Sequence, residues 1–337
     1  MTDKRKIDDA RDAAISLRVG TEQDGVSVSE FYKLGPDRLF TIYGKAIYEV
    51  IFPDDVDPKR TNPNIRPVHQ QILPYGLDDE FVSRILMTDK TLVGERKLPG
   101  FPEHRISLLA FECLKDLIAM REMRDDLAKV QQAVEKKFES ETQTRESTRL
   151  PSIPDIEVRC EGITQRARHA VACINDIAVA FFGDELKKKS WLEVLIDLIV
   201  ADQVVDEERA NHWEKIRSFI TFVVETRNAV EHRKDGYRFK ICDYRLGVDN
   251  LISQPTVELV HPKLPLGPSP ALAFVNSIIE GLLVVYEDVV AALCDLKLRH
   301  QKGAPMYVVE VPLDQRRYKF VRFGYAIELG GKTHFML

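Results

Sequence analysis

The chain has 337 residues, which is longer than a single helical core usually needs and therefore favours two domains. Hydrophobic residues make up 44% and charged residues 30% of the chain, a composition that argues against a disordered or fibrous protein. The formal net charge of −5 argues against a protein that coats nucleic acid through a general surplus of Lys and Arg, although a local basic patch is compatible with it.

Cysteine usage and the charge of the apolar segments indicate where the protein works. The five cysteines are scattered and form no Cys-x-x-Cys pair, which fits neither a zinc site nor a secreted disulfide framework. The amino terminus is charged where a signal peptide needs an apolar core, and acidic residues interrupt the apolar stretch 271–296. We therefore predict a cytoplasmic protein with no membrane span, no metal and no cofactor.

The first 100 residues form a region to which we assign no chemistry. They contain short segments such as FYKLGPDRLFTIYGKAIYEVIF, followed by a loop rich in Pro and Asp whose prolines prevent a continued helix. We predict an α-rich amino-terminal domain over residues 1–100.

A long amphipathic helix is predicted from Pro102 to about Glu139, because apolar residues recur at every seventh position and others fill the offset positions. The recurring residues are Ile106, Cys113, Met120, Leu127 and Val134. Such a seam is either a core helix or a dimer contact. Periodicity is lost near residues 140–157, where two prolines mark a linker, so residues 101–156 comprise this helix and the linker.

The segment 157–302 is predicted to be a bundle of four helices. Helical patterns cover residues 159–183, 189–201, 206–233 and 271–301. Between the third and fourth helices, YRFKICDYRL and PTVELV have the length and composition of strands and flank a turn at 247–250. We predict a β-hairpin inserted into the bundle over residues 237–260.

A second hairpin is predicted in the terminal segment 303–337, with Tyr307 to Val311 facing Arg317 to Tyr325. The predicted fold class is therefore mainly α, with a four-helix bundle, an inserted β-hairpin, an α-rich amino-terminal region and a carboxy-terminal β-hairpin.

One charged side chain is predicted on the apolar face of the third bundle helix. Arg227 falls within the stripe made by Trp213, Ile216, Ile220, Val223 and Val224. Because an unpaired buried guanidinium is strongly destabilising, Arg227 needs a salt bridge, a subunit interface or an anionic ligand. His232 follows five residues later, about 140° around an ideal helix, so the two side chains meet only if the helix bends or two copies pair.

The sequence RNAVEH at 227–232 resembles the signature of the HEPN superfamily: an Arg, four to six residues, and a His near the end of a bundle helix, usually with a polar residue after the Arg. The resemblance covers roughly residues 157–302 and implies a metal-independent endoribonuclease, dimeric, and often part of toxin–antitoxin or antiphage systems. It places Arg227 and His232 at the catalytic positions and Asn228 at the polar one. Many members lack activity and serve as binding modules.

These residue types suit RNA cleavage without a metal. A histidine titrates in the range needed to take the proton of a 2′-hydroxyl, and an arginine stabilises the negative charge that develops on the phosphorus centre. Attack by the 2′-hydroxyl would leave a 2′,3′-cyclic phosphate. No cluster of His, Asp and Glu at metal-ligand spacing stands in the sequence.

Several basic residues near the motif and in the terminal hairpin are candidate RNA contacts. Arg238 and Lys240 share one face of a predicted strand, and the end hairpin interleaves basic residues with aromatic rings. Exposed strands also use such charges to resist aggregation, so both interpretations stay open. The candidate RNA-binding residues are Arg233, Lys234, Arg238, Lys240, Arg317 and Lys319.

Three hypotheses follow from the sequence. The first is an RNA-cleaving homodimer, with RNA as substrate and an antitoxin or another protein as a further partner. The second is a catalytically silent dimerisation or partner-binding module. The third is a nucleic-acid-binding regulator that uses the basic hairpins.

Overall fold

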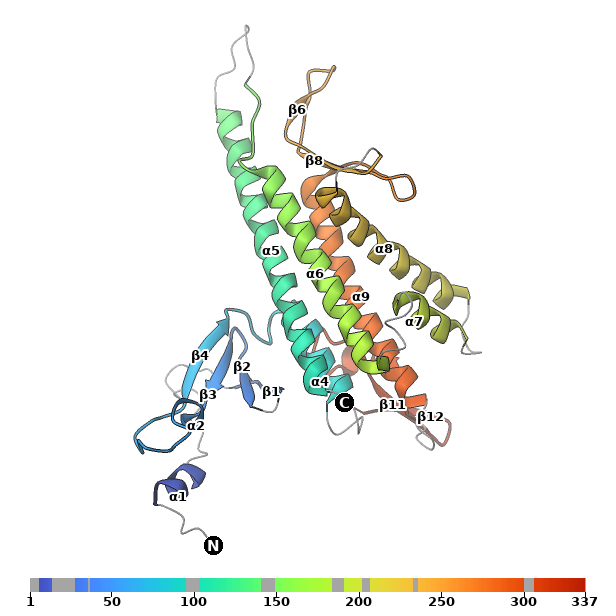
Figure 1. The fold of residues 1–337 in the computed structure, drawn as a ribbon. Helices are drawn as coiled ribbons and strands as arrows, with labels where there is room; N and C mark the ends of the chain where they lie inside the picture. Colours follow the sequence, from blue (N-terminus) through green and yellow to red (C-terminus); the bar gives the residue numbers. More distant parts are fainter. Residues whose placement is uncertain are drawn as a thin grey trace. The chain divides into compact units, whose positions relative to one another are not determined.

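The computed structural model describes residues 6–13, 28–35, 37–94, 103–140, 149–183, 191–201, 207–232, 236–299 and 306–336. The chain divides into two compact units (Figure 1). Unit 1 is formed by Met1–Leu108 together with Pro305–Leu337, and unit 2 by Leu109–Ala304. The terminal segment therefore shares a unit with the amino-terminal residues, although nearly 200 residues of sequence separate them.

Unit 1 contains a four-stranded antiparallel sheet in which each strand pairs with the next one in the sequence. Its strands are β1 (Glu30–Leu34), β2 (Arg38–Ile42), β3 (Ile47–Ile51) and β4 (Val68–Leu73). Aromatic and β-branched residues favour these strands, and Gly35 provides the positive φ of 75° in the turn between β1 and β2. The prediction of an α-rich amino-terminal region is therefore wrong.

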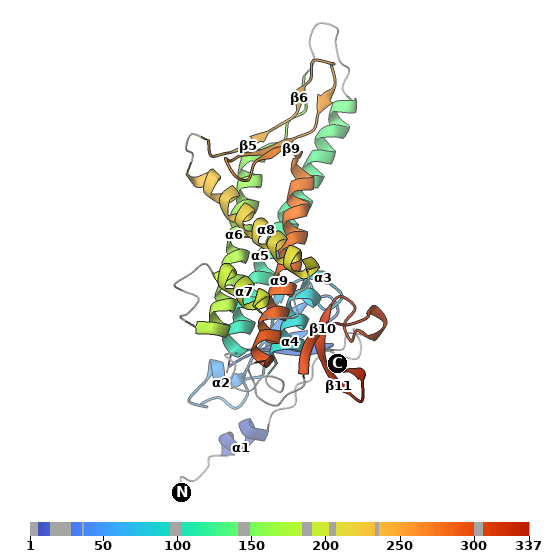
Figure 2. The ribbon, with the colours of Figure 1, turned by 90° about the vertical axis from the view of Figure 1, so that its right-hand side faces the viewer.

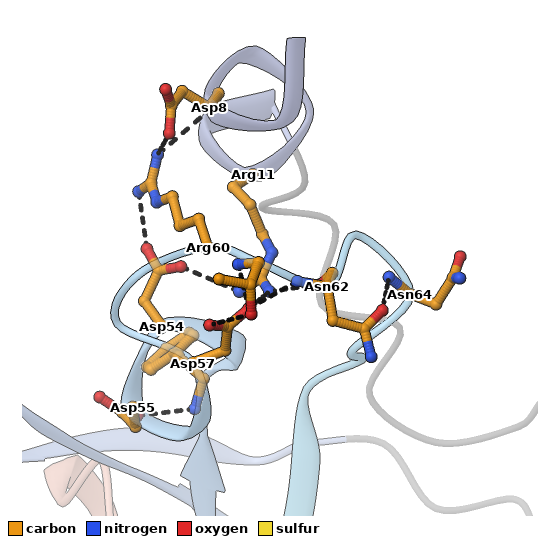
Figure 3. A network of polar contacts seen from close by, with 10 residues as sticks. Asp8, Arg11, Asp54, Asp55, Asp57, Arg60, Asn62 and Asn64 are labelled. Carbon is orange, nitrogen blue, oxygen red and sulfur yellow. Dashed lines mark hydrogen bonds and ion pairs between the residues drawn. The ribbon is translucent and has the colours of Figure 1, made fainter. Parts of the chain in front are cut away.

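An ionic network joins the first helix to the loop after β3 (Figure 3). Arg11 of α1 (Lys6–Ala13) pairs with Asp54 at 2.9 Å and with Asp57 at 3.3 Å. Asp54 lies in the short helix α2 (Pro53–Val56). Asp57 accepts hydrogen bonds from the backbone amides of Asn62 and Thr61, which hold the pKa of its carboxyl below the usual value. The network thus ties the loop after β3, whose sequence is rich in Pro and Asp, to helix α1.

A buried helical stretch follows the sheet in unit 1. It consists of α3 (Glu80–Val82), a π-helical turn η2 (Ser83–Met87) and α4 (Thr88–Val93). The Asp79 side chain caps the start of α3 by accepting from the amides of Phe81 and Val82. Apolar residues of this stretch, such as Ile85, Leu86 and Leu92, are fully buried, so it forms much of the core of unit 1.

The terminal segment adds a three-stranded antiparallel sheet to unit 1, of order β10-β11-β12. The strands are β10 (Met306–Glu310), β11 (Phe323–Leu329) and β12 (Lys332–Met336). The hydroxyl of Tyr325 on β11 donates a hydrogen bond to the backbone oxygen of Leu92 on α4. The predicted terminal hairpin is corrected in two respects: a third strand follows it, and residues 316–322 form a loop instead of the start of the second strand.

Unit 2 is built on long helices, whose positions confirm the predicted helical segments within a few residues. They are α5 (Glu103–Ser140), whose first residues belong to unit 1, α6 (Ile156–Phe182), α7 (Trp191–Val200), α8 (Glu207–Glu231) and α9 (Ala271–Arg299). Helices α5, α6 and α9 run side by side in both views (Figures 1 and 2). Cys113, Met120 and Leu127 of the predicted seam are fully buried, so these residues pack within the chain.

A sheet caps the end of unit 2 where α8 ends and α9 begins (Figure 2). Its strands, in the order β5-β8-β9, are β5 (Arg238–Cys242), β8 (Thr256–Val260) and β9 (Leu266–Pro270). Strands β6 (Arg245–Leu246) and β7 (Ile252–Ser253) extend the connection into a short ribbon that turns at 247–250. The inserted hairpin is confirmed, and β9 is an addition that the Pro-rich sequence did not indicate.

The fold class as a whole differs from the prediction of a mainly helical protein. Of the residues that the structure describes, 56% are helical and 21% lie in strands, which form four sheets, so the fold is mixed α and β. Helical periodicity over long segments dominates the sequence, whereas the strands have at most seven residues and leave a weaker pattern.

Candidate functional site

The motif residues lie in the last turns of α8, next to the sheet that caps unit 2 (Figure 2). Thr226 and Ala229 face the core and are buried, while Arg227 and Asn228 are half-buried. His232 is exposed and directly follows the helix. Its backbone amide donates to the carbonyl oxygen of Asn228 at 2.8 Å, so the helical hydrogen-bond pattern continues to the histidine.

This continuity fixes the angle between the two motif side chains. Since the i to i−4 hydrogen bond of α8 is kept as far as His232, five residues of regular helix separate Arg227 and His232, which corresponds to about 140° around the axis. The two side chains therefore leave the helix on different sides.

Arg227 is held by two neighbouring side chains. Its guanidinium forms an ion pair with Glu231 one turn later on α8, and its Nε donates to Oε1 of Gln165 on α6 at 3.3 Å. The side chain of Arg227 retains 24% of its exposure. The acidic partner that the apolar surroundings required is thus on the same helix, and the contact to the neighbouring helix is an amide.

Two histidines that the sequence did not indicate also contact the neighbours of Arg227 and Asn228. The Nε2 of His169 on α6 is 3.0 Å from Nε2 of Gln165, so the contacts run from Arg227 through Gln165 to an exposed imidazole. The second is His261, a buried residue directly after β8. Neither lies near the motif in sequence, and only the packing of α6 and the inserted sheet against α8 brings them there.

The hydrogen bonds of His261 identify its tautomer. Its Nδ1 accepts from the backbone amides of Lys263 at 3.2 Å and Leu264 at 3.0 Å, so the proton of the neutral ring is on Nε2. That nitrogen is 3.4 Å from Glu225 of α8, whose other oxygen accepts from the side-chain amide of Asn228 at 3.3 Å. Asn228 is therefore oriented by Glu225, which itself contacts His261.

The predicted RNA-binding residues fall into different parts of the chain. Arg238 and Lys240 are exposed on β5 of unit 2, and Lys240 pairs with Glu258 at 3.1 Å. In unit 1, Arg317 pairs with Glu30 at 2.8 Å, and the Lys319 ammonium lies 4.9 Å from the centre of the Phe320 ring. Arg233 and Lys234 lie outside the described residues. The structure thus unites Arg238 and Lys240 on one strand and places Arg317 and Lys319 in the other unit.

Within the ranges that the structure describes, no group of three or more His, Cys, Asp and Glu side chains is placed to hold a metal ion. Among the same residues, no helix is both long and apolar enough to cross a membrane. All five cysteines are free thiols. Burial raises the pKa of Cys160 and that of Cys173 to about 12, so neither thiol is activated as a nucleophile.

Comparisons of the chain with protein-family models, with curated proteins and with solved structures each gave no match. The functional argument therefore rests on the residues of the chain.

Proposed function

We propose that the protein is a metal-independent endoribonuclease of the cytoplasm, with Arg227 and His232 as catalytic residues and Asn228 beside them. One observation carries the proposal: a guanidinium held by Gln165 and Glu231 lies in the same final turns of α8 that end at an exposed histidine. A positioned cation and a solvent-accessible imidazole are the two groups that cleavage by the RNA's own 2′-hydroxyl requires.

The chemistry assigns one step to each group. His232 takes the proton of the 2′-hydroxyl, the 2′-oxygen bonds to the adjacent phosphorus, and the bond from phosphorus to the 5′-oxygen of the next nucleotide breaks. The leaving 5′-oxygen takes its proton from water, and the protonated His232 later returns its proton to solvent. Arg227 donates to the phosphate oxygens as their negative charge grows. The products are a 2′,3′-cyclic phosphate and a 5′-hydroxyl.

The separation of the two side chains around α8 favours a site shared by two copies of the chain. In a two-fold dimer, Arg227 of one protomer can meet His232 of its partner, and each dimer then holds two equivalent sites. We extend the proposal to this homodimer with RNA as substrate. A role in toxin–antitoxin or antiphage defence, with an antitoxin as a further partner, follows from the HEPN resemblance alone.

The proposal is tested by incubating the full chain with single-stranded RNA in excess EDTA. We expect cleavage, products that end in 2′,3′-cyclic phosphate, and no cleavage of DNA of the same sequence, because DNA lacks the attacking hydroxyl. Cleavage that requires an added divalent metal would contradict the mechanism, as would products that end in a simple 3′-hydroxyl.

The ion pair with Glu231 predicts a variant with improved substrate binding. Glu231 competes with the RNA phosphate for the Arg227 guanidinium, so we expect Glu231→Gln to lower KM for RNA about two- to five-fold without changing kcat, as suits a partly exposed ion pair. Steady-state kinetics on a short RNA measure both constants. Glu214→Gln is the matched control, because Glu214 pairs with Arg217 on the exposed face of the same helix. A loss of kcat in Glu231→Gln alone would contradict this role.

The same ion pair favours a second candidate function, a catalytically silent binding module. A guanidinium already neutralised by Glu231 needs no phosphate, and its contact with Gln165 joins α8 to α6. This alternative predicts a dimer that cleaves none of a varied set of RNAs, and analytical ultracentrifugation beside the cleavage assay separates the two candidates.

A further inference from the structure

Unit 1 contains a cavity of about 460 Å³ that the proposed ribonuclease chemistry does not use. Its wall comes from β1, from α4 and Gly94 after it together with the first residues of α5, and from the connection between β10 and β11 with Phe323 at the start of β11. The volume is in the range of cavities that hold small organic molecules.

A buried carboxylate with a free oxygen lies in the wall of this cavity. Asp89 is 2% exposed, and its Oδ2 accepts hydrogen bonds from the hydroxyls of Tyr32 at 2.6 Å and Ser107 at 2.8 Å. Its Oδ1 is buried and has no hydrogen-bond partner among the residues that the structure describes. Because an unsatisfied buried acceptor is costly, this oxygen is available to an N–H donor that a ligand brings.

The charged side chains of the wall favour an anionic group elsewhere on the ligand. Four cations line the cavity, Lys33, Lys90, Arg316 and Arg317, against the two carboxylates of Asp89 and Glu103. Glu30, which lies outside the wall, pairs with both Lys90 and Arg317. The Nε of Arg316 donates to the backbone oxygen of Val311 at 2.9 Å, which anchors its guanidinium at the cavity. A terminal nitrogen of the same guanidinium lies 3.4 Å from Glu310, a partly exposed carboxylate outside the wall with which the ligand's anionic group would compete. Arginine forks of this kind suit phosphate oxygens.

Aromatic rings complete the wall. Phe31 is 49% exposed although it lines the cavity, and Tyr318 and Phe323 contribute two more rings. The Arg317 guanidinium lies 5.0 Å from the centre of the Tyr318 ring. An exposed ring beside anchored cations is the arrangement that stacks a planar base next to its phosphate.

We propose that this cavity binds a mononucleotide. The base stacks on the aromatic rings and donates an N–H to Oδ1 of Asp89, and the phosphate is bound by Arg316 and Arg317. The ligand thus supplies both the hydrogen bond that Asp89 lacks and the negative charge that the cations favour. The site shares no residue with the catalytic pair on α8 and is independent of the proposed ribonuclease activity.

The proposal is tested by isothermal titration of the full chain with AMP, GMP, CMP and UMP, with the matching nucleosides and inorganic phosphate as references. We expect at least one mononucleotide to bind about ten-fold or more tightly than its nucleoside and than phosphate. Asp89→Asn preserves the shape and replaces the free acceptor with a donor, so it should weaken that binding about ten-fold or more. Arg316→Ala should weaken binding of the nucleotide and leave that of the nucleoside unchanged.

Two further variants separate this site from other effects. Lys45→Ala removes an exposed cation of unit 1 outside the cavity, and Arg217→Ala removes an exposed cation of unit 2; both should bind the nucleotide as the wild type does. Circular dichroism checks that each variant is folded. Equal affinity for inorganic phosphate, unchanged binding in both Asp89→Asn and Arg316→Ala, or no binding of any of the four nucleotides at millimolar concentration would overturn the proposal.

Discussion

Mixing two inactive variants is expected to restore ribonuclease activity. Arg227→Ala and His232→Ala should each lower the cleavage rate by roughly two orders of magnitude or more, as expected when a charge stabiliser or a general base is removed. In a heterodimer of the two variants, one shared site lacks both groups and the other is complete. Because random exchange makes half of the dimers heterodimers, the mixture should recover about one quarter of the wild-type rate.

The outcome decides how the site is built. If both catalytic groups acted within one chain, every site in the mixture would lack one group, and mixing would restore nothing. The exposed Arg217 on the same helix provides the control: Arg217→Ala should retain full activity alone and in mixtures. Since the ion pair of Arg227 with Glu231 is partly exposed, its loss should leave the fold intact.

Asp89→Asn is expected to change how stability depends on pH. Burial raises the pKa of Asp89 to about 6 in the folded protein, from 3.8 in the unfolded chain, despite the hydrogen bonds from Tyr32 and Ser107. Between these values the folded state binds more protons than the unfolded state, so stability falls as pH rises through this window. The difference of about two pKa units corresponds to about 3 kcal/mol of unfolding free energy. The wild type loses this stability as pH rises, and Asp89→Asn does not, because asparagine has no proton to release.

Urea unfolding of both proteins at pH 4 and at pH 8 measures this effect. We expect the unfolding free energy of the wild type to fall by about 3 kcal/mol relative to that of Asp89→Asn between the two conditions. A saturating nucleotide should reduce the difference at pH 8, because its N–H group supplies the missing hydrogen bond. Parallel stability curves for the two proteins would mean that the pKa of Asp89 in the folded state is not raised above its value in the unfolded chain.

The long helices were predictable from sequence because each presents several turns of one apolar face. Helix α6 buries residues from Ile156 to Phe181 along one stripe, and this repetition outweighs single exceptions. The strands of unit 1 were not predictable in the same way. Five residues such as Arg38–Ile42 give too few alternations, and the last three of them are all buried.

The motif on α8 was likewise visible in sequence, whereas its surroundings were not. A polar residue such as Gln165 acquires a role only because α6 packs against α8, and His261 only because the inserted sheet returns beside the same helix. The cavity of unit 1 could not be predicted from the sequence, since Asp89 and Arg316 come to it from distant parts of the chain. Local sequence patterns carry no information about such pairings.

The division of unit 1 between the two ends of the sequence has a consequence for biosynthesis. Residues up to Leu108 leave the ribosome well before Pro305–Leu337, so α4 is made long before β11, whose Tyr325 binds its backbone. Unit 2 is one continuous stretch of sequence and can fold as it emerges from the ribosome. The earlier part of unit 1 keeps apolar surface exposed until Pro305–Leu337 has been synthesised. A nascent chain that stalls before residue 305 would therefore carry one finished unit and one unfinished unit, the kind of intermediate that chaperones bind.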